Sequence, residues 1–99
     1  MSTVLSFATA PGPDGATVLT AAGEIDMSNA AEFAAALDAA LAQAAGGTVV
    51  VDLTKIDYID SAGLAVVFPH VERVRLIASE LLAPVLTVVG LDDVTTVRA

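Results

Sequence analysis

The segment Val49-Val-Val-Asp-Leu-Thr-Lys-Ile-Asp-Tyr-Ile-Asp-Ser-Ala-Gly-Leu64 carries the most information about the fold of this chain. The segment begins within a short apolar run, residues 48–53, which follows Gly46 and Gly47. A short continuous run of this kind is typical of a strand that is buried on both faces of a sheet. Residues 54–60 are predicted to form a loop, after which Ser61 is placed to cap a helix that begins at Ala62. The segment therefore predicts a strand and a loop that bring a serine to the N-terminal end of a helix.

A longer helix is predicted before this strand. Ser28 or Asn29 can cap it, and Glu32 follows Asn29 by three residues, as in a capping box. An apolar stripe then recurs at four-residue spacing, at Phe33, Leu37 and Leu41. The helix is predicted to end at Gly46-Gly47, because glycine commonly terminates helices.

A β-hairpin is predicted at the start of the chain. Residues 3–9 and residues 16–21 have the composition of strands. The segment Pro11-Gly-Pro-Asp-Gly15 between them consists of residues that preset φ or permit positive φ, so it predicts the turn. A hairpin, a helix and then a buried strand together indicate an α/β domain with a right-handed crossover.

The remaining elements are shorter. Pro69 limits the helix that follows Ser61 to two or three turns, because proline disfavours helix in the residue before it and lacks an N–H donor. Residues 73–78 alternate weakly and predict a strand. A last helix is predicted over residues 79–89, and Pro84 within it either kinks the helix or makes it start late.

Composition excludes several classes of function. The 99 residues suit one domain, residues 1–99, with 56% hydrophobic content and no cysteine to form disulfides or thiolate metal sites. A single histidine excludes a multi-histidine metal site, and no cofactor is expected. The net charge of −8 has the wrong sign for binding nucleic acid. The apolar runs are too short to insert in a membrane, and the N-terminus has no basic region of a signal peptide, so we expect a cytoplasmic protein.

Enzymatic activity is not expected from the serine. A serine nucleophile needs a base within hydrogen-bond reach. The one histidine, His70, is nine residues beyond Ser61, roughly 13 Å along a helix and on its opposite side. Asp60-Ser-Ala-Gly63 is also not the Gly-x-Ser-x-Gly elbow of hydrolases.

The position of Ser61 suggests a switch instead. Free backbone N–H groups at a helix N-terminus favour an anion, and phosphorylation would add about −1.5 to −2 charge beside Asp57 and Asp60. Local amides are expected to stabilise the phosphate, while the carboxylates oppose it. The simpler alternative is that Ser61 only caps the helix, since serine is among the commonest N-caps.

Four blocks of the sequence resemble the STAS domain, and more narrowly the stand-alone anti-sigma-factor antagonists of bacteria. In chain order they are Gly23-Glu-Ile-Asp26, Val49-Val-Val-Asp-Leu53, Tyr58-Ile-Asp-Ser-Ala-Gly-Leu64 and Gly90-Leu-Asp-Asp-Val94. One block alone is a weak signal, but four in the family's order are a strong one. The resemblance implies a STAS-type mixed β-sheet of about four strands that packs against helices, with an N-terminal hairpin.

The resemblance implies a regulatory binding module, an anti-anti-sigma factor that acts in transcription regulation. In that family an anti-sigma factor, a serine kinase of the histidine-kinase-like ATPase fold, binds the unmodified antagonist and releases its sigma factor. The kinase phosphorylates the serine after the aspartate, here Ser61, which ends the complex, and a PP2C-type phosphatase reverses this. Asp26 matches a family aspartate close to that serine, and Ala62 stands where many members have a second serine.

The implied partner surface is the start of the second helix with the loops beside it. Tyr58 and Leu64 would add apolar contact area there, although either residue is more often part of a core. The full set is Asp26, Asp57, Tyr58, Asp60, Ser61, Ala62, Gly63 and Leu64. A second hypothesis keeps the fold but makes the chain a STAS subunit of a membrane ABC-type transport complex, with Ser61 unmodified.

The chain departs from the family pattern after Ser61. Between Ser61 and Ser79 it is shorter than usual by roughly two helical turns. The second helix is therefore expected to be truncated at Pro69, which changes the surface that a partner meets at its far end.

Overall fold

The computed structural model describes residues 5–12, 15–91 and 93–97. Its elements, in chain order, are β1 (Ser6–Pro11), β2 (Thr17–Ile25), α1 (Ala30–Gln43), β3 (Val49–Ile59), α2 (Ser61–Val67), the 3-10 turn η2 (Phe68–His70), β4 (Val74–Ser79), α3 (Ala83–Val88) and β5 (Val94–Val97). Residues 3 and 4 of the predicted first strand, residues 13 and 14 of the predicted turn, and Asp92 of the fourth sequence block lie outside the described residues.

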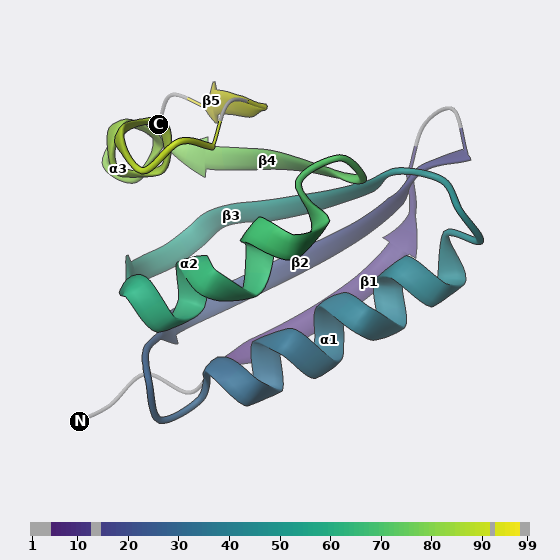
Figure 1. The fold of residues 1–99 in the computed structure, drawn as a ribbon, viewed down its shortest axis with the longest axis horizontal. Coiled ribbons are helices and arrows are strands. Elements are labelled where there is room, and N and C mark those ends of the chain that lie inside the picture. Colours follow the sequence, from purple (N-terminus) through teal and green to yellow (C-terminus); the bar gives the residue numbers. More distant parts are fainter. Residues whose placement is uncertain (1–4, 13–14, 92, 98–99) are drawn as a thin grey trace.

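The strands form one five-stranded sheet in the order β1-β2-β3-β4-β5 (Figure 1). β1 and β2 are antiparallel, with pairs running from Ser6 and Ala22 to Pro11 and Thr17, so the predicted hairpin is confirmed. The other neighbouring pairs are parallel. The mixed α/β fold is therefore confirmed, with one strand more than the predicted four or so.

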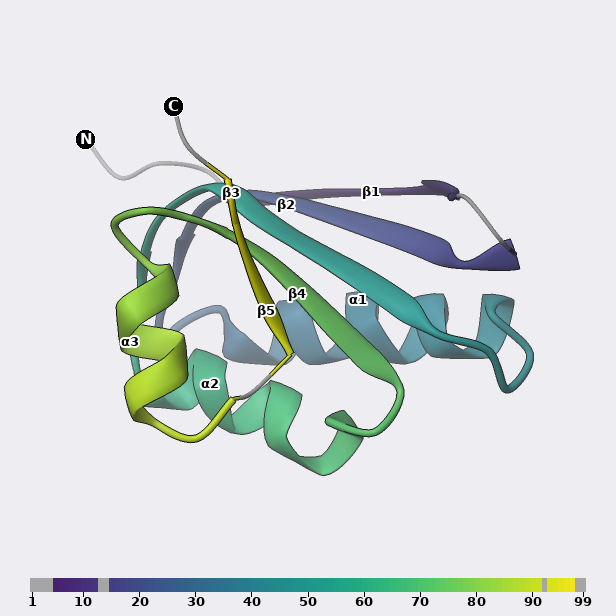
Figure 2. The same ribbon diagram turned by 90° about the horizontal axis from the view of Figure 1, so that it is seen from above.

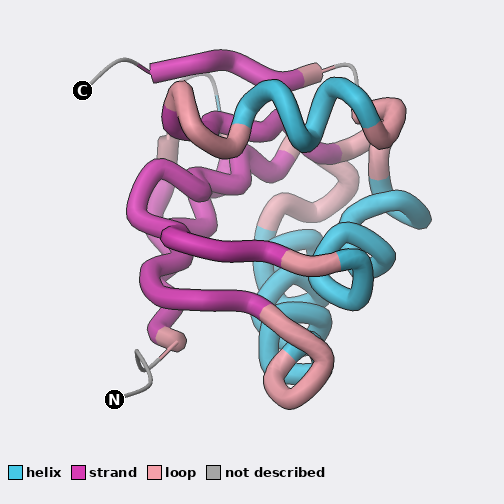
Figure 3. The backbone as a smooth tube through the Cα atoms, turned by 90° about the vertical axis from the view of Figure 1, so that its left-hand side faces the viewer, coloured by secondary structure: helices cyan, strands magenta, loops and turns pink. Residues whose placement is uncertain are grey.

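The core lies between the sheet and the helices, which Figures 2 and 3 show on one side of it. The predicted stripe of α1, Phe33, Leu37 and Leu41, is buried there. The ring of Phe33 stacks on Phe7 of β1, with centroids 6.1 Å apart and planes 4° apart. This contact helps hold α1 against the antiparallel edge of the sheet.

Two predictions about β3 are wrong. Residues 54–59 continue the strand, because β2 goes on pairing with it up to Ile25 and Ile59, through two register shifts. Burial along β3 also alternates, with Val49, Val51 and Leu53 fully buried and Val50 half-buried. A strand covered by helices on one side shows this alternation, whereas the prediction of two buried faces assumed helices on both.

The last helix and the last strand complete the fold. Of the two possibilities left open for Pro84, the structure has the late start: α3 begins at Ala83, with Pro84 in its first turn. Gly90, at φ +102°, then turns the chain toward β5. β5 was not predicted, because a four-residue strand has too little sequence pattern and depends on β4 for its hydrogen bonds.

The truncated second helix is confirmed. α2 ends at Val67, and Phe68–His70 continue as a single 3-10 turn that contains Pro69. None of the helices in the described part of the chain is both long and apolar enough to cross a membrane.

Candidate functional site

Asp60 caps α2, and Ser61 is its first helical residue. The Asp60 carboxylate accepts hydrogen bonds through Oδ1 from the N–H groups of Ala62, at 2.9 Å, and Gly63, at 3.2 Å. The prediction that Ser61 caps this helix is therefore wrong by one residue. Asp60 takes the cap position because its own N–H donates to the Ile25 carbonyl at 3.1 Å, which keeps its backbone extended at the end of β3.

This shift leaves the Ser61 hydroxyl available. Ser61 is exposed, and its side chain makes no hydrogen bond to any described residue. A capping serine would have its oxygen engaged with backbone N–H groups. The hydroxyl instead stands at the surface, at the start of α2.

The second oxygen of Asp60 links α2 to a distant loop. Asp60 Oδ2 accepts from the N–H of Met27 at 3.2 Å, in the turn between β2 and α1. The Met27 side chain is 82% exposed, so this backbone bond fixes a turn that presents a large apolar side chain to solvent. Sequence reasoning missed Met27, and its only signal was its place directly after Asp26.

Asp26 organises the same turn. Its Oδ1 accepts from the N–H of Ser28 at 2.8 Å and from the Ser28 hydroxyl, and its own N–H donates to Asn29 Oδ1 at 2.9 Å. The bonds from Ser28, side chain first, lower the pKa of Asp26 below its usual 3.8. The turn therefore holds an ionised carboxylate in a fixed place.

Asn29 takes part in this turn rather than in a capping box. It occupies the N-cap position of α1 as predicted, but its side chain makes no capping bond. Its amide instead donates to the Glu24 carbonyl at 2.9 Å and accepts from Asp26. The predicted box with Glu32 is wrong because these contacts with the end of β2 use the side chain.

Close packing positions α2 against the ends of β2 and β3. A Cβ on Gly63 would lie 2.7 Å from Ile25 Cγ2 and 2.7 Å from Ile59 Cγ1, so only glycine fits without a shift. Leu64 is 7% exposed and belongs to the core. Of the residues expected to touch a partner, Gly63 and Leu64 thus lie on the buried face of α2, where they pack the helix against the rest of the core.

The other expected residues lie in the turn after β2, at the end of β3 and at the start of α2. Asp57 is exposed and Tyr58 is 50% exposed near the end of β3, whose last pairs bring Tyr58 beside Glu24 of β2. We define the switch surface as Asp26, Met27, Asp57, Tyr58, Asp60, Ser61 and Ala62. It contains the large exposed side chains of Met27 and Tyr58, three carboxylates and the Ser61 hydroxyl.

His70 is part of a different region. It follows the far end of α2 and lies 3.8 Å from the Asp38 carboxylate of α1. Within the described ranges, no group of three or more His, Asp or Glu side chains is arranged to hold a metal ion. The start of α2 thus presents an exposed serine hydroxyl next to the Asp60 carboxylate.

Comparison with known proteins agrees with this fold. The family model described as "Mlab, STAS domain" matches residues 8–97. A search of curated proteins found no match to the chain.

Solved structures of similar fold include several anti-sigma factor antagonists. The antagonist from Mycobacterium paratuberculosis is 22% identical, with a TM-score of 0.80 over 93% of this chain and 86% of that one. SpoIIAA in its unphosphorylated form is 19% identical, with a TM-score of 0.64 over 95% and 89%. The Bacillus cell fate determinant SpoIIAA in its phosphorylated form is 20% identical, with a TM-score of 0.66 over 95% and 91%. These identities establish a shared fold, and the family match, over most of the chain, shows that this protein belongs to the STAS domain family.

Proposed function

We propose that this protein is an anti-anti-sigma factor: it binds a kinase-type anti-sigma factor and thereby releases a sigma factor in the cytoplasm. The observation that carries the proposal is the exposed Ser61 hydroxyl at the start of α2. Because Asp60 caps the helix, this hydroxyl is not engaged in capping. The similar structures support it, since they include an anti-sigma factor antagonist solved in unphosphorylated and in phosphorylated form.

The switch surface is the proposed docking site. Met27 and Tyr58 are the two large exposed side chains of this surface, and apolar anchors of this kind contribute most to interface affinity. The neighbouring carboxylates and the net charge of −8 suit a partner groove that is basic. Hydrogen bonds to the Asp60 carboxylate and within the turn at Asp26 hold this surface in shape before binding, which reduces the entropy lost on association.

Phosphorylation of Ser61 by the partner kinase would end the complex through repulsion and bulk. The N–H groups of Ala62 and Gly63, which would otherwise stabilise a phosphate, already bind Asp60 Oδ1. The sequence-based expectation of stabilising local amides therefore needs revision. A phosphate dianion on Ser61 would follow Asp60, whose carboxylate forms no ion pair with a described cation, so the added charge would act on the docked partner. A PP2C-type phosphatase would restore the binding form.

The test is binding to a purified kinase-type anti-sigma factor from the same organism, measured by titration calorimetry without nucleotide. Wild type and Ser61→Ala are expected to bind alike, whereas Ser61→Asp is expected to bind at least tenfold more weakly, about 1.4 kcal/mol. Thr9→Asp is the matched control, because Thr9 is an exposed hydroxyl residue on β1 that pairs with Leu19, toward the end of β2 opposite from Ile25. Equal binding by all four proteins would contradict the proposed phosphorylation switch. No binding by any of them would contradict the proposed class of partner.

A further inference from the structure

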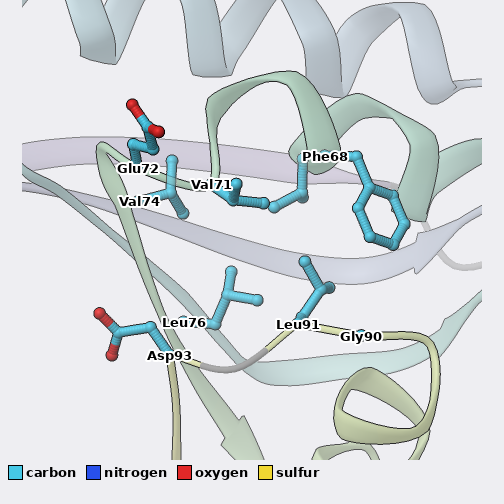
Figure 4. A pocket seen from close by; sticks show the side chains of 9 residues that line it. Phe68, Val71, Glu72, Val74, Leu76, Gly90, Leu91 and Asp93 are labelled. Carbon is cyan, nitrogen blue, oxygen red and sulfur yellow. The ribbon is translucent and has the colours of Figure 1, made fainter.

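A recess lies at the far end of α2 from Ser61. It has a volume of about 260 Å³ (Figure 4). Its floor is apolar and buried, and its walls include side chains that are 41% and 46% exposed, those of Phe68 and Val71. We call it the α2–β5 pocket, and its apolar lining consists of Val67, Phe68, Val71, Val74, Leu76 and Leu91.

Two chain turns, one before β4 and one after α3, form the walls of this recess. On one side the truncated α2 gives way to η2, and the N–H of Arg73 donates to the His70 carbonyl at 2.9 Å as the chain turns toward β4. On the other side Gly90 turns the chain after α3, and the N–H of Leu91 donates to the Leu86 carbonyl at 3.0 Å. Because backbone hydrogen bonds hold both walls, the pocket is formed without a ligand.

Both charged residues that line the pocket are acidic. Glu72 and Asp93 stand at one end of it, opposite Phe68 (Figure 4). Arg75 lies 3.7 Å from Asp93, but both side chains are more than 60% exposed, and an ion pair of this kind is weak and readily exchanged. The pocket therefore presents an apolar hollow with a negative end.

We propose that the α2–β5 pocket docks a segment of a partner protein that inserts one large apolar side chain and places a Lys or Arg next to it, against Glu72 and Asp93. The volume is just below the roughly 300–1,000 Å³ typical of small-molecule sites, and it suits a single anchoring side chain. Charge complementarity selects a basic flank. This inference goes beyond the proposed function, since it concerns other residues and does not require Ser61.

The probe is the peptide acetyl-Phe-Arg-amide, titrated into ¹⁵N-labelled full-length protein and followed by amide chemical shifts. We expect saturable shifts at Val71, Leu76 and Leu91. Acetyl-Ala-Arg-amide lacks the anchor and is expected to bind about tenfold more weakly. Acetyl-Phe-Glu-amide reverses the charge and is expected to bind about two- to fivefold more weakly, as is the first peptide with the variant Glu72→Lys. Glu32→Lys, the same change at an exposed site on α1, is expected to leave affinity unchanged.

Shifts that map elsewhere, or that are the same with the alanine peptide, would overturn the proposal. Equal effects of Glu72→Lys and Glu32→Lys would overturn the role of the acidic end. If the same amides shift as the protein alone is concentrated, with slower translational diffusion, the occupant is a second copy and the proposed partner segment is wrong. Ser61→Asp is expected to bind the peptide like wild type, so a failure here is distinguishable from a failure of the phosphorylation switch.

Discussion

The carboxylate of Asp60 accepts a hydrogen bond from the backbone N–H of Met27 at 3.2 Å, across 33 residues of chain. The other oxygen of the same group caps α2. The Asp60 side chain thus fixes the start of the helix that carries Ser61, and it also ties the turn at Met27 to that helix start.

Replacing Asp60 is therefore expected to disturb stability and the switch surface together. Asp60→Ala removes the helix cap and the link to Met27, and we expect a loss of about 1–2 kcal/mol in the free energy of unfolding. Urea unfolding measures this loss, and hydrogen exchange at the Met27 amide reports the link. Asp57→Ala, at an exposed neighbouring aspartate, is expected to stay within about 0.5 kcal/mol of wild type. Equal losses in the two variants would contradict the role of Asp60.

The Asp60 carboxylate is also expected to determine how a negative charge at position 61 changes the stability of the fold. An acidic residue in the first turn of a helix usually stabilises it by about 0.3–1 kcal/mol. In Ser61→Asp we expect no such gain, because Asp60 already holds the N–H groups and repels a second carboxylate.

A double-mutant comparison checks this explanation. In the Asp60→Asn background the repulsion is absent, and Ser61→Asp is expected to recover a gain of about 0.3–1 kcal/mol in the free energy of unfolding. The measurement is urea unfolding of the four proteins at pH 7. A stabilising Ser61→Asp in the wild-type background would show that the helix amides are free to receive an anion.

The turn at Asp26 is expected to weaken in acid. The hydrogen bonds from Ser28 lower the pKa of Asp26 in the folded state below its ordinary 3.8. A group with a depressed folded pKa stabilises the fold above its unfolded pKa, and this contribution is lost as the pH falls through the folded value. Carboxyl NMR titration should place the Asp26 midpoint below 3.8, and Ser28→Ala should raise it. A midpoint unchanged by Ser28→Ala would rule out this cause.

Gly63 is expected to tolerate no side chain. In Gly63→Ala the new Cβ would meet Ile25 Cγ2 and Ile59 Cγ1 at 2.7 Å, atoms close to the backbone that cannot swing away. We expect a loss of about 1–3 kcal/mol in the free energy of unfolding, by overpacking. Thermal unfolding checks this, with Ala65→Ser, exposed on the same helix, as a control near wild type. A neutral Gly63→Ala would mean that α2 can move away from the sheet.

Much of the fold could be predicted because its signals are local. The hairpin, α1 and the buried start of β3 follow from turn residues, four-residue spacing and a short apolar run. The end of β3 could not be predicted, because residues 54–59 are strand only through their pairing with β2. β5 was missed for the same reason, since its hydrogen bonds come from β4.

The sequence by itself determined that an aspartate and a serine would stand at the start of a short helix that Pro69 ends. Only the tertiary structure decided which of the two caps that helix. The bond from the Asp60 N–H to the Ile25 carbonyl keeps Asp60 extended, so its carboxylate becomes the cap and Ser61 enters the helix with a free hydroxyl. Both residues are good caps, so local preference could not separate them, whereas a contact across 35 residues of chain did.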